Sequence, residues 1–265
     1  MLRKSLLVVG LFVVSTSFAE NVVCAPGSYS PDKSKEIKWY RDSAEQKALY
    51  NQGYSLATNY IRTWVRKHHP KAKTWGVVID IDETALDNSW YYRVCGDNAN
   101  DENKFSHYVV NPMRSTALPG VIAFTHLVHD LGGYVTMVSN RDGSFKDSSG
   151  SVLMSSAKNL KSQNIYFDQV VLANLHDSKI PYDKNPRFEA INSGKYDAKE
   201  MVWSNELPAY NVIAYLGDNI QDFPKFKQSI LNQTNGDDPV FKSFGSGNFI
   251  MPNPMYGSWE ANSYK

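Results

Sequence analysis

The chain has 265 residues, of which 42% are hydrophobic and 13% aromatic, and its formal net charge is +1. This length and apolar content are sufficient for one large domain, or for a core with a small accessory region. The nearly balanced charge argues against a nucleic-acid polymer or an acidic lipid surface as a partner, because both favour a strongly basic protein.

The N-terminal segment predicts export. Arg3 and Lys4 precede an apolar run over residues 6–14, and a Ser-Phe-Ala sequence follows at residues 17–19. This order is typical of a signal peptide, here cleaved after Ala19, and the run is too short to span a bilayer. We therefore expect a periplasmic or secreted protein without a stable membrane span.

Two cysteines, Cys24 and Cys95, are present in the sequence. In an oxidising compartment a disulfide between them would stabilise the protein by roughly 2–4 kcal/mol. Two free thiols remain an alternative. A lipid anchor on Cys24 is a weaker alternative, because residues 21–23 (Asn-Val-Val) are not the small residues that a lipidation site requires.

Residues 20–40 mix proline, glycine, serine and charge, and predict an extended lead-in to a single domain over residues 41–265. Ser43 is a plausible N-cap for a helix over residues 44–69, which ends in basic residues before Pro70. The residues expected on its buried face are Leu49, Gly53, Leu56, Tyr60 and Trp64.

Strands then alternate with helices along the chain. The expected strands cover residues 74–81, 134–138, 169–172 and 212–216, and the expected helices cover 119–131 and 149–163. Residues 87–118 are polar and aromatic and indicate an irregular insertion over the end of the first strand. The alternation predicts an α/β fold with a parallel sheet and right-handed crossovers.

Polar side chains follow each expected strand. They are Asp80 and Asp82, then Ser139 and Asn140, then Lys184 and Arg187, and finally Asp218 and Asp222. The carboxyl ends of parallel strands meet at one edge of a sheet, where ligands bind. Paired carboxylates there require a cation, and their hard oxygen ligands suit Mg²⁺. The pattern indicates metal-assisted chemistry on an anionic substrate.

These motifs resemble those of haloacid-dehalogenase (HAD) phosphatases, most closely the bacterial class C acid phosphatases of subfamily IIIB, which include an outer-membrane nucleotide phosphatase. The matching runs are Asp-Ile-Asp-Glu-Thr at 80–84, Val-Ser-Asn at 138–140, Lys184, Leu-Gly-Asp-Asn-Ile-Gln-Asp-Phe at 216–223 and Pro-Asn-Pro-Met-Tyr-Gly-Ser-Trp at 252–259. The resemblance covers roughly residues 37–260. It implies a Rossmann-like core with a parallel sheet flanked by helices, and a small, mainly helical accessory or cap region.

The resemblance implies Asp80 as the nucleophile that forms an aspartyl-phosphate. Mg²⁺ would be held by Asp80, the backbone carbonyl of Asp82 and Asp218, with Asp222 binding directly or through water. Asp82 would act first as general acid and then as general base. We further expect Ser139 and Asn140 to bind phosphoryl oxygens, Lys184 to neutralise charge, and Arg187 to support the acidic cluster.

Four aromatic residues are candidates to stack on a nucleobase or phenyl leaving group: Trp90, Tyr91, Tyr92 and Tyr256. The alternative is that they pack the cap against the core. The leading hypothesis is an exported, Mg²⁺-dependent acid phosphatase acting on phosphomonoesters, including nucleoside monophosphates. A catalytically weak storage or phosphate-binding protein is disfavoured by the presence of both aspartates, whereas a phosphotransferase would share the same intermediate. A dimer is possible.

Overall fold

The computed structural model describes residues 35–96, 99, 101–110 and 115–263. The expected signal peptide at residues 1–19, most of the expected lead-in, and Cys24 lie outside these residues. Within the described ranges, we find no helix that combines the length and apolarity needed to cross a membrane.

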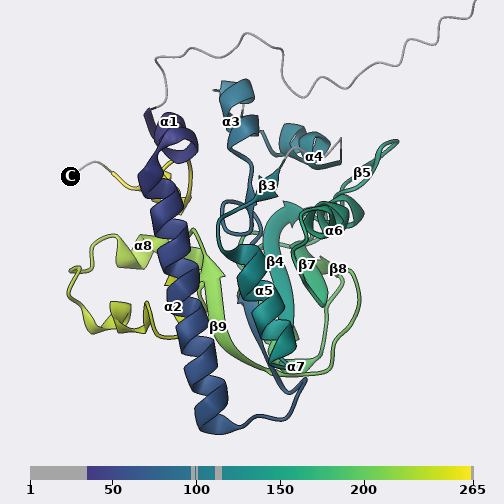
Figure 1. Ribbon diagram of the computed structural model, residues 1–265. Helices are drawn as coiled ribbons and strands as arrows, with labels where there is room; N and C mark the ends of the chain where they lie inside the picture. Colours follow the sequence, from purple (N-terminus) through teal and green to yellow (C-terminus); the bar gives the residue numbers. More distant parts are fainter. Residues whose placement is uncertain (1–34, 97–98, 100, 111–114, 264–265) are drawn as a thin grey trace, which may run out of the picture.

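A six-stranded sheet forms the centre of the protein, as the sequence predicts (Figure 1). Its order is β10 (Asn248–Ile250), β9 (Asn211–Gly217), β1 (Trp75–Ile79), β4 (Tyr134–Asp142), β7 (Gln169–Ala173) and β8 (Met201–Trp203). All neighbours are parallel except β7 and β8. The four predicted strands are the middle four. The two edge strands were missed because each has only three residues, too few for a periodic pattern.

Helices cover both faces of the sheet (Figure 1). On one face α2 (Ala44–His68), α5 (Val121–Asp130) and α6 (Val152–Ser162) pack on inward residues such as Val77 and Ile79. On the other face α7 (Asn185–Ser193) packs in a second cluster with Val78. Alternate residues of β1 therefore enter different cores, which explains why this strand is a continuous apolar run.

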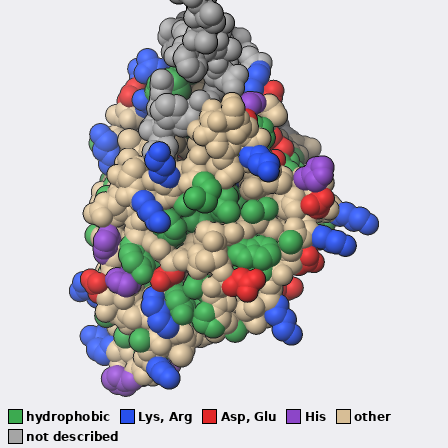
Figure 2. All heavy atoms as spheres, turned by 90° about the vertical axis from the view of Figure 1, so that its right-hand side faces the viewer, with side chains coloured by type: hydrophobic (Ala, Val, Ile, Leu, Met, Phe, Trp, Pro, Cys, Tyr) green, Lys and Arg blue, Asp and Glu red, His purple; other side chains and the backbone are tan. Residues whose placement is uncertain are grey.

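The remaining elements are short. They are α1 (Lys35–Asp42), β2 (Leu86–Asp87), α3 (Ser89–Cys95), α4 (Glu102–Val110), β3 (Thr116–Ala117), β5 (Lys146–Asp147), β6 (Gly150–Ser151), α8 (Gln228–Leu231) and the 3-10 helices η2 (Ile220–Asp222), η3 (Pro239–Ser243) and η4 (Ser258–Ala261). On the face shown in Figure 2, lysine and arginine side chains are interspersed with aspartate and glutamate among the described residues. This face therefore presents mixed charge rather than a continuous basic surface.

Helix α2 begins where the sequence predicts, but its buried face is different. Ser43 accepts a hydrogen bond from the backbone N–H of Gln46 at 3.1 Å and so caps the helix. The buried residues are Gln46, Tyr50, Tyr54, Ala57 and Ile61, whereas Leu49 and Leu56 are 41% and 45% exposed. The prediction is wrong for Leu49 and Leu56, whereas Tyr60 and Trp64 pack partly buried against the core as expected. The loop after β1 offers backbone carbonyls, which the Tyr50 and Tyr54 hydroxyls bind and leucine cannot.

The expected extended lead-in is wrong over residues 35–40, which belong to helix α1. Tyr40 is buried in this helix, and its hydroxyl lies 2.7 Å from that of Tyr50 on α2. The segment folds as a helix because docking on α2 buries this aromatic side chain, a tertiary contact that local composition does not show.

The described residues between 87 and 118 include two helices, so this insertion is helical, as the resemblance implies, rather than irregular. Helices α3 and α4 are joined to the core by the antiparallel pair β2 and β3. Aromatic rings hold the cap together, with Tyr91 lying 5.1 Å from Phe105 and 5.0 Å from Tyr108, measured between ring centroids. Cys95 at the end of α3 is buried and disulfide-bonded. Its pairing with Cys24 stays a prediction, because that residue is outside the described ranges.

Candidate active site

The site is built around the carboxyl end of β1, the strand between β9 and β4. The backbone N–H of Asp80 donates to the carbonyl of Leu216 on β9 at 2.9 Å, which ties the residue to the neighbouring strand. The chain then turns tightly, with the N–H groups of Ala85 and Leu86 donating to the carbonyl of Ile81 at 3.0 and 2.8 Å. These backbone hydrogen bonds fix the segment from which the Asp80 and Asp82 side chains project.

Three carboxylates gather at this edge of the sheet. Asp80, Asp218 and Asp222 each offer an oxygen, and these oxygens all lie within 4.8 Å of one another. Burial raises the pKa of Asp80 to about 7, opposed by the Lys184 charge and reinforced by Asp222. Burial and the neighbouring aspartates also raise the pKa of Asp218 well above its usual range. A hard divalent cation fits this donor set, because it offsets both the loss of hydration on burial and the repulsion between the carboxylates.

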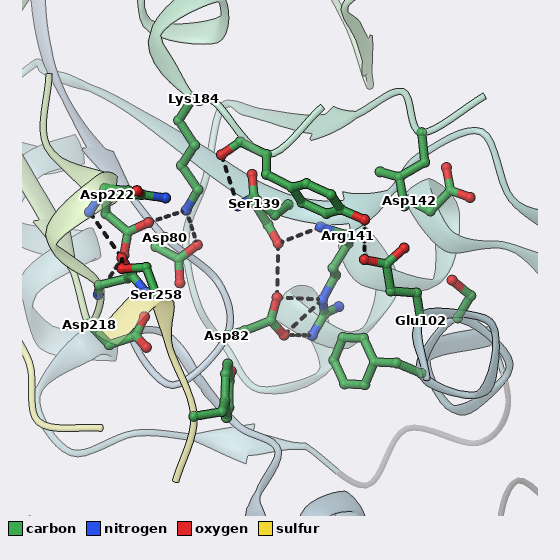
Figure 3. Close-up of a pocket in the computed structure, with 18 of the residues that line it drawn as sticks. Asp80, Asp82, Glu102, Ser139, Arg141, Asp142, Lys184, Asp218, Asp222 and Ser258 are labelled. Atoms are coloured by element: carbon green, nitrogen blue, oxygen red, sulfur yellow. Dashed lines mark hydrogen bonds and ion pairs between the residues drawn. The ribbon is translucent and has the colours of Figure 1, made fainter. Parts of the chain in front are cut away.

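Lys184 provides the counter-charge within the cluster. Its ammonium contacts Asp80, lies 2.7 Å from Asp222, and donates to the carbonyl of Val138 at 3.2 Å (Figure 3). Burial lowers the pKa of Lys184, but the two carboxylates more than offset this, so the pKa is raised above its ordinary value. The side chain therefore stays charged although it is only 3% exposed. The expected convergence of Lys184 with the aspartates is present.

Hydrogen bonds from three segments hold the carboxylates of Asp218 and Asp222 in place. Asp218 accepts hydrogen bonds from Thr84 at 3.1 Å and from Asn253 at 2.8 Å. Asp222 accepts from the backbone N–H of Asn219 at 2.9 Å. Asn253 had no assigned role in the sequence analysis, although it lies in the 252–259 segment that carried part of the resemblance.

Asp82 lies apart from the acidic cluster and binds Arg141 instead (Figure 3). The guanidinium Nη2 lies 2.7 Å from one carboxylate oxygen, and Nε lies 3.0 and 3.1 Å from the two oxygens. Ser139 and Asn88 donate further hydrogen bonds at 2.8 and 2.7 Å. Burial lowers the pKa of Arg141, but Asp82 outweighs this and raises it. The Asp82 carboxylate is therefore surrounded by donors.

Sequence reasoning missed Arg141 as a functional residue. Its only sequence signal was its position directly after the Ser139-Asn140 pair at the end of a strand. The side chain is 5% exposed and also donates to Ser156 on α6 at 2.8 Å. A buried arginine in such a place requires a buried anion, but the sequence does not show which carboxylate it meets.

Arg187 donates its hydrogen bonds to the end of β4 and to the segment before α7. Its guanidinium donates to the carbonyls of Ser139 and Pro181 at 3.2 Å each, and to the side chain of Asn140. Burial lowers its pKa to about 10, opposed by the charges of Asp80 and Asp222. Arg187 therefore holds the end of β4 that carries Ser139 and Asn140, and its support of the acidic cluster is through charge rather than through a hydrogen bond.

A cavity of about 330 Å³ lies over these groups and is lined by Asp80, Asp82, Ser139, Asn140, Lys184, Asp218 and Asp222. Aromatic residues line it as well, namely Tyr92, Phe105, Tyr182 and Tyr256. Tyr92 and Tyr256 stack on each other with ring centroids 4.5 Å apart and an angle of 19° between the rings. Phe105 and Tyr182 were not predicted, because nothing local marks them as different from packing residues.

Two of the predicted aromatic residues do not line the cavity. Tyr91 is fully buried, and Trp90 stacks on Tyr108 at a centroid distance of 6.1 Å. Their expected contact with a leaving group is therefore wrong in this structure. On a helix, consecutive side chains point about 100° apart, so α3 directs only one of the three adjacent aromatics to the cavity.

Comparison with known proteins agrees with this geometry. A sequence model of the HAD superfamily, subfamily IIIB (acid phosphatase), matches residues 15–259. The class C acid phosphatase from Bacillus anthracis is similar in structure, with 26% identity, a TM-score of 0.67 and 85% of each chain covered. Its tungstate-bound structure has 25% identity, a TM-score of 0.65 and the same coverage.

The chain therefore belongs to subfamily IIIB of the HAD superfamily, the acid phosphatases. Within this subfamily it is a class C acid phosphatase, a hydrolase of phosphomonoesters.

Gly217 allows Asp222 to approach the cluster, which yields a testable prediction. A Cβ at position 217 would lie 2.3 Å from the Cβ of Asp222 and 2.5 Å from its Oδ2. Gly217→Ala should displace this carboxylate and weaken divalent-cation binding on the order of 10–100-fold. Calorimetric titration with Mg²⁺ measures the change. Gly236→Ala is the control, since nothing lies within 4 Å of its added Cβ; equal affinities in the two variants would contradict the prediction.

Proposed function

We propose that this protein is an exported, Mg²⁺-dependent acid phosphatase in which Asp80 attacks the phosphorus of a phosphomonoester. The observation that carries the proposal is the position of Asp80 at the cavity floor, within the carboxylate cluster and in contact with Lys184. Attack forms a bond between the Asp80 oxygen and phosphorus, and breaks the bond to the leaving alkoxide. Water then cleaves the aspartyl-phosphate and regenerates the carboxylate.

Asp80, Asp218 and Asp222 are the side chains that would hold the Mg²⁺, together with the backbone carbonyl of Asp82. A bound Mg²⁺ would offset the repulsion between the attacking carboxylate and the phosphate dianion. Thr84 and Asn253 orient Asp218 for this role, and Asn219 orients Asp222.

Asp82 is the proposed proton carrier. It gives a proton to the leaving oxygen in the first step and takes one from the attacking water in the second. Its carboxylate is held by Arg141, Ser139 and Asn88. Donation of a proton requires at least one of these donors to turn away. Ser139 is suited to this exchange, because its hydroxyl can turn from Asp82 toward a phosphoryl oxygen.

The aromatic lining of the cavity favours substrates with an aromatic leaving group, nucleosides among them. Tyr92 and Tyr256 present a stacked pair of rings beside the acidic cluster, and Phe105 and Tyr182 extend the apolar lining. Stacking on aromatic rings is favourable for planar groups. The similar class C enzyme binds tungstate, a tetrahedral oxyanion like phosphate, which supports a phosphate group as part of the substrate.

Asp80→Asn should reduce hydrolysis of p-nitrophenyl phosphate on the order of 10⁴-fold or more, because the amide is not a competent nucleophile. Release of p-nitrophenol measures the rate. Asp130→Asn is the matched control, since Asp130 is exposed at the end of α5. Hydrolysis at the wild-type rate by the Asp80 variant would refute the nucleophile assignment.

Removal of divalent cations with EDTA should abolish hydrolysis, and added Mg²⁺ should restore it. The physical reason is the excess of three clustered carboxylates over the single ammonium of Lys184. Phosphatase assays across a series of free Mg²⁺ concentrations test this dependence. Full activity in the presence of EDTA would argue against a metal role.

The exported protein should begin at Glu20, if the signal peptide is cleaved after Ala19. Mass spectrometry of the protein recovered outside the cytoplasm of an expressing bacterium gives the N-terminal mass directly. Detection of a lipid-modified Cys24 in this experiment would contradict the prediction and indicate a membrane-anchored protein.

A further inference from the structure

Glu83 is a fully buried carboxylate that the proposed reaction does not use. It follows Asp82 directly, its side chain is 0% exposed, and its backbone φ is +51°. A carboxylate is expensive to bury unless it is well bonded, and a positive φ is uncommon outside glycine. Glu83 therefore combines a buried carboxylate with a positive φ in the loop that carries Asp80. Such unfavourable features persist where the contacts of the residue offset their cost.

Both carboxylate oxygens of Glu83 are occupied by donors from different segments. One accepts the backbone N–H of Asn88 at 2.7 Å, directly before α3, and the other accepts the hydroxyl of Tyr256 from the C-terminal segment. The backbone carbonyl of Glu83 accepts from Tyr50 on α2. Glu83 therefore joins the start of α3 to two segments that are distant in sequence, α2 and the C-terminal segment.

Two of these segments carry the aromatic wall of the cavity. Tyr92 belongs to α3, whose N-terminus is held through Asn88, and Tyr256 is held through its hydroxyl. The two rings stack on each other and line the cavity. Glu83 is fully buried, so water does not compete for these two hydrogen bonds, and the side chain is suited to hold both segments in this arrangement.

We propose that Glu83 is a positioning residue that fixes the Tyr92–Tyr256 pair as the wall on which a planar leaving group rests. In this role Glu83 determines specificity, favouring aryl and nucleoside phosphates over alkyl phosphates. The inference rests on the proposed phosphatase function and adds a determinant of substrate choice outside the reacting groups.

Glu83→Leu is the sharpest probe because leucine is of similar size and carries no hydrogen-bonding atom in its side chain. The Asn88 N–H and the Tyr256 hydroxyl both lose their partner in this variant. Tyr256→Phe removes the second of these contacts from the other side and leaves the ring in place. If Glu83 acts by holding Tyr256, the double variant should be little worse than either single variant.

The experiment compares kcat and KM for p-nitrophenyl phosphate, adenosine monophosphate and glycerol 2-phosphate in wild type, both single variants and the double variant. Each single variant should lower the ratio of aromatic to alkyl kcat/KM by about threefold to tenfold, mainly through a higher KM for the aromatic substrates. Tyr166→Phe is the matched control, because that hydroxyl also donates to a carboxylate, Asp168, but outside the cavity. It should leave the ratio unchanged.

Equal losses on aromatic and alkyl substrates, or additive losses in the double variant, would overturn the positioning role. If Glu83→Leu does not fold, as judged by thermal melting, Tyr256→Phe decides alone, and an unaltered ratio in that variant refutes the proposal. A wild-type protein that hydrolyses none of the three esters would overturn the proposed function as well. An active wild type with an unaltered ratio in the variants overturns this inference only.

Discussion

The structure depends on the compensation of three clustered carboxylates by one buried ammonium. Asp80, Asp218 and Asp222 repel one another, and the Lys184 ammonium contacts Asp80 and Asp222. Burial raises the pKa values of Asp80 and Asp218, and the neighbouring aspartates add to this effect. The excess of negative charge at this edge of the sheet favours binding of a divalent cation, and a bound cation then attracts phosphate.

The tight loop after β1 organises the site around this cluster. Four residues of the loop contact four different parts of the site. Asp80 belongs to the carboxylate cluster, and Asp82 binds Arg141. Glu83 binds the C-terminal segment, and Thr84 donates to Asp218. Because the loop is bonded to α2 through the Tyr50 and Tyr54 hydroxyls, the helix outside the sheet also supports the catalytic geometry. One short loop thus links the proposed metal ligands, the proposed proton carrier and the cavity wall.

Much of the fold was predictable because its signals are local and periodic. The middle four strands are apolar runs, and Ser43 marks the start of α2 by its capping chemistry. The convergence of Asp80, Lys184 and Asp218 followed from a single rule, that parallel strands end at one edge. The prediction that Leu49 and Leu56 lie on the buried face of α2 was wrong for a different reason. Leucine is the more apolar residue, but the facing surface offered carbonyls that only the tyrosines could bind.

The sequence by itself determined the α/β class, the strand ends and the acidic residues placed there, because these depend on local periodicity and on a general property of parallel sheets. Only the tertiary structure decided the partners of buried polar groups. Three such contacts join residues far apart in the chain: Arg141 binds Asp82, Arg187 binds the carbonyl of Ser139, and Glu83 binds Tyr256. Such pairs follow from three-dimensional proximity, since a buried charge must find a partner but its own sequence neighbours do not identify which one.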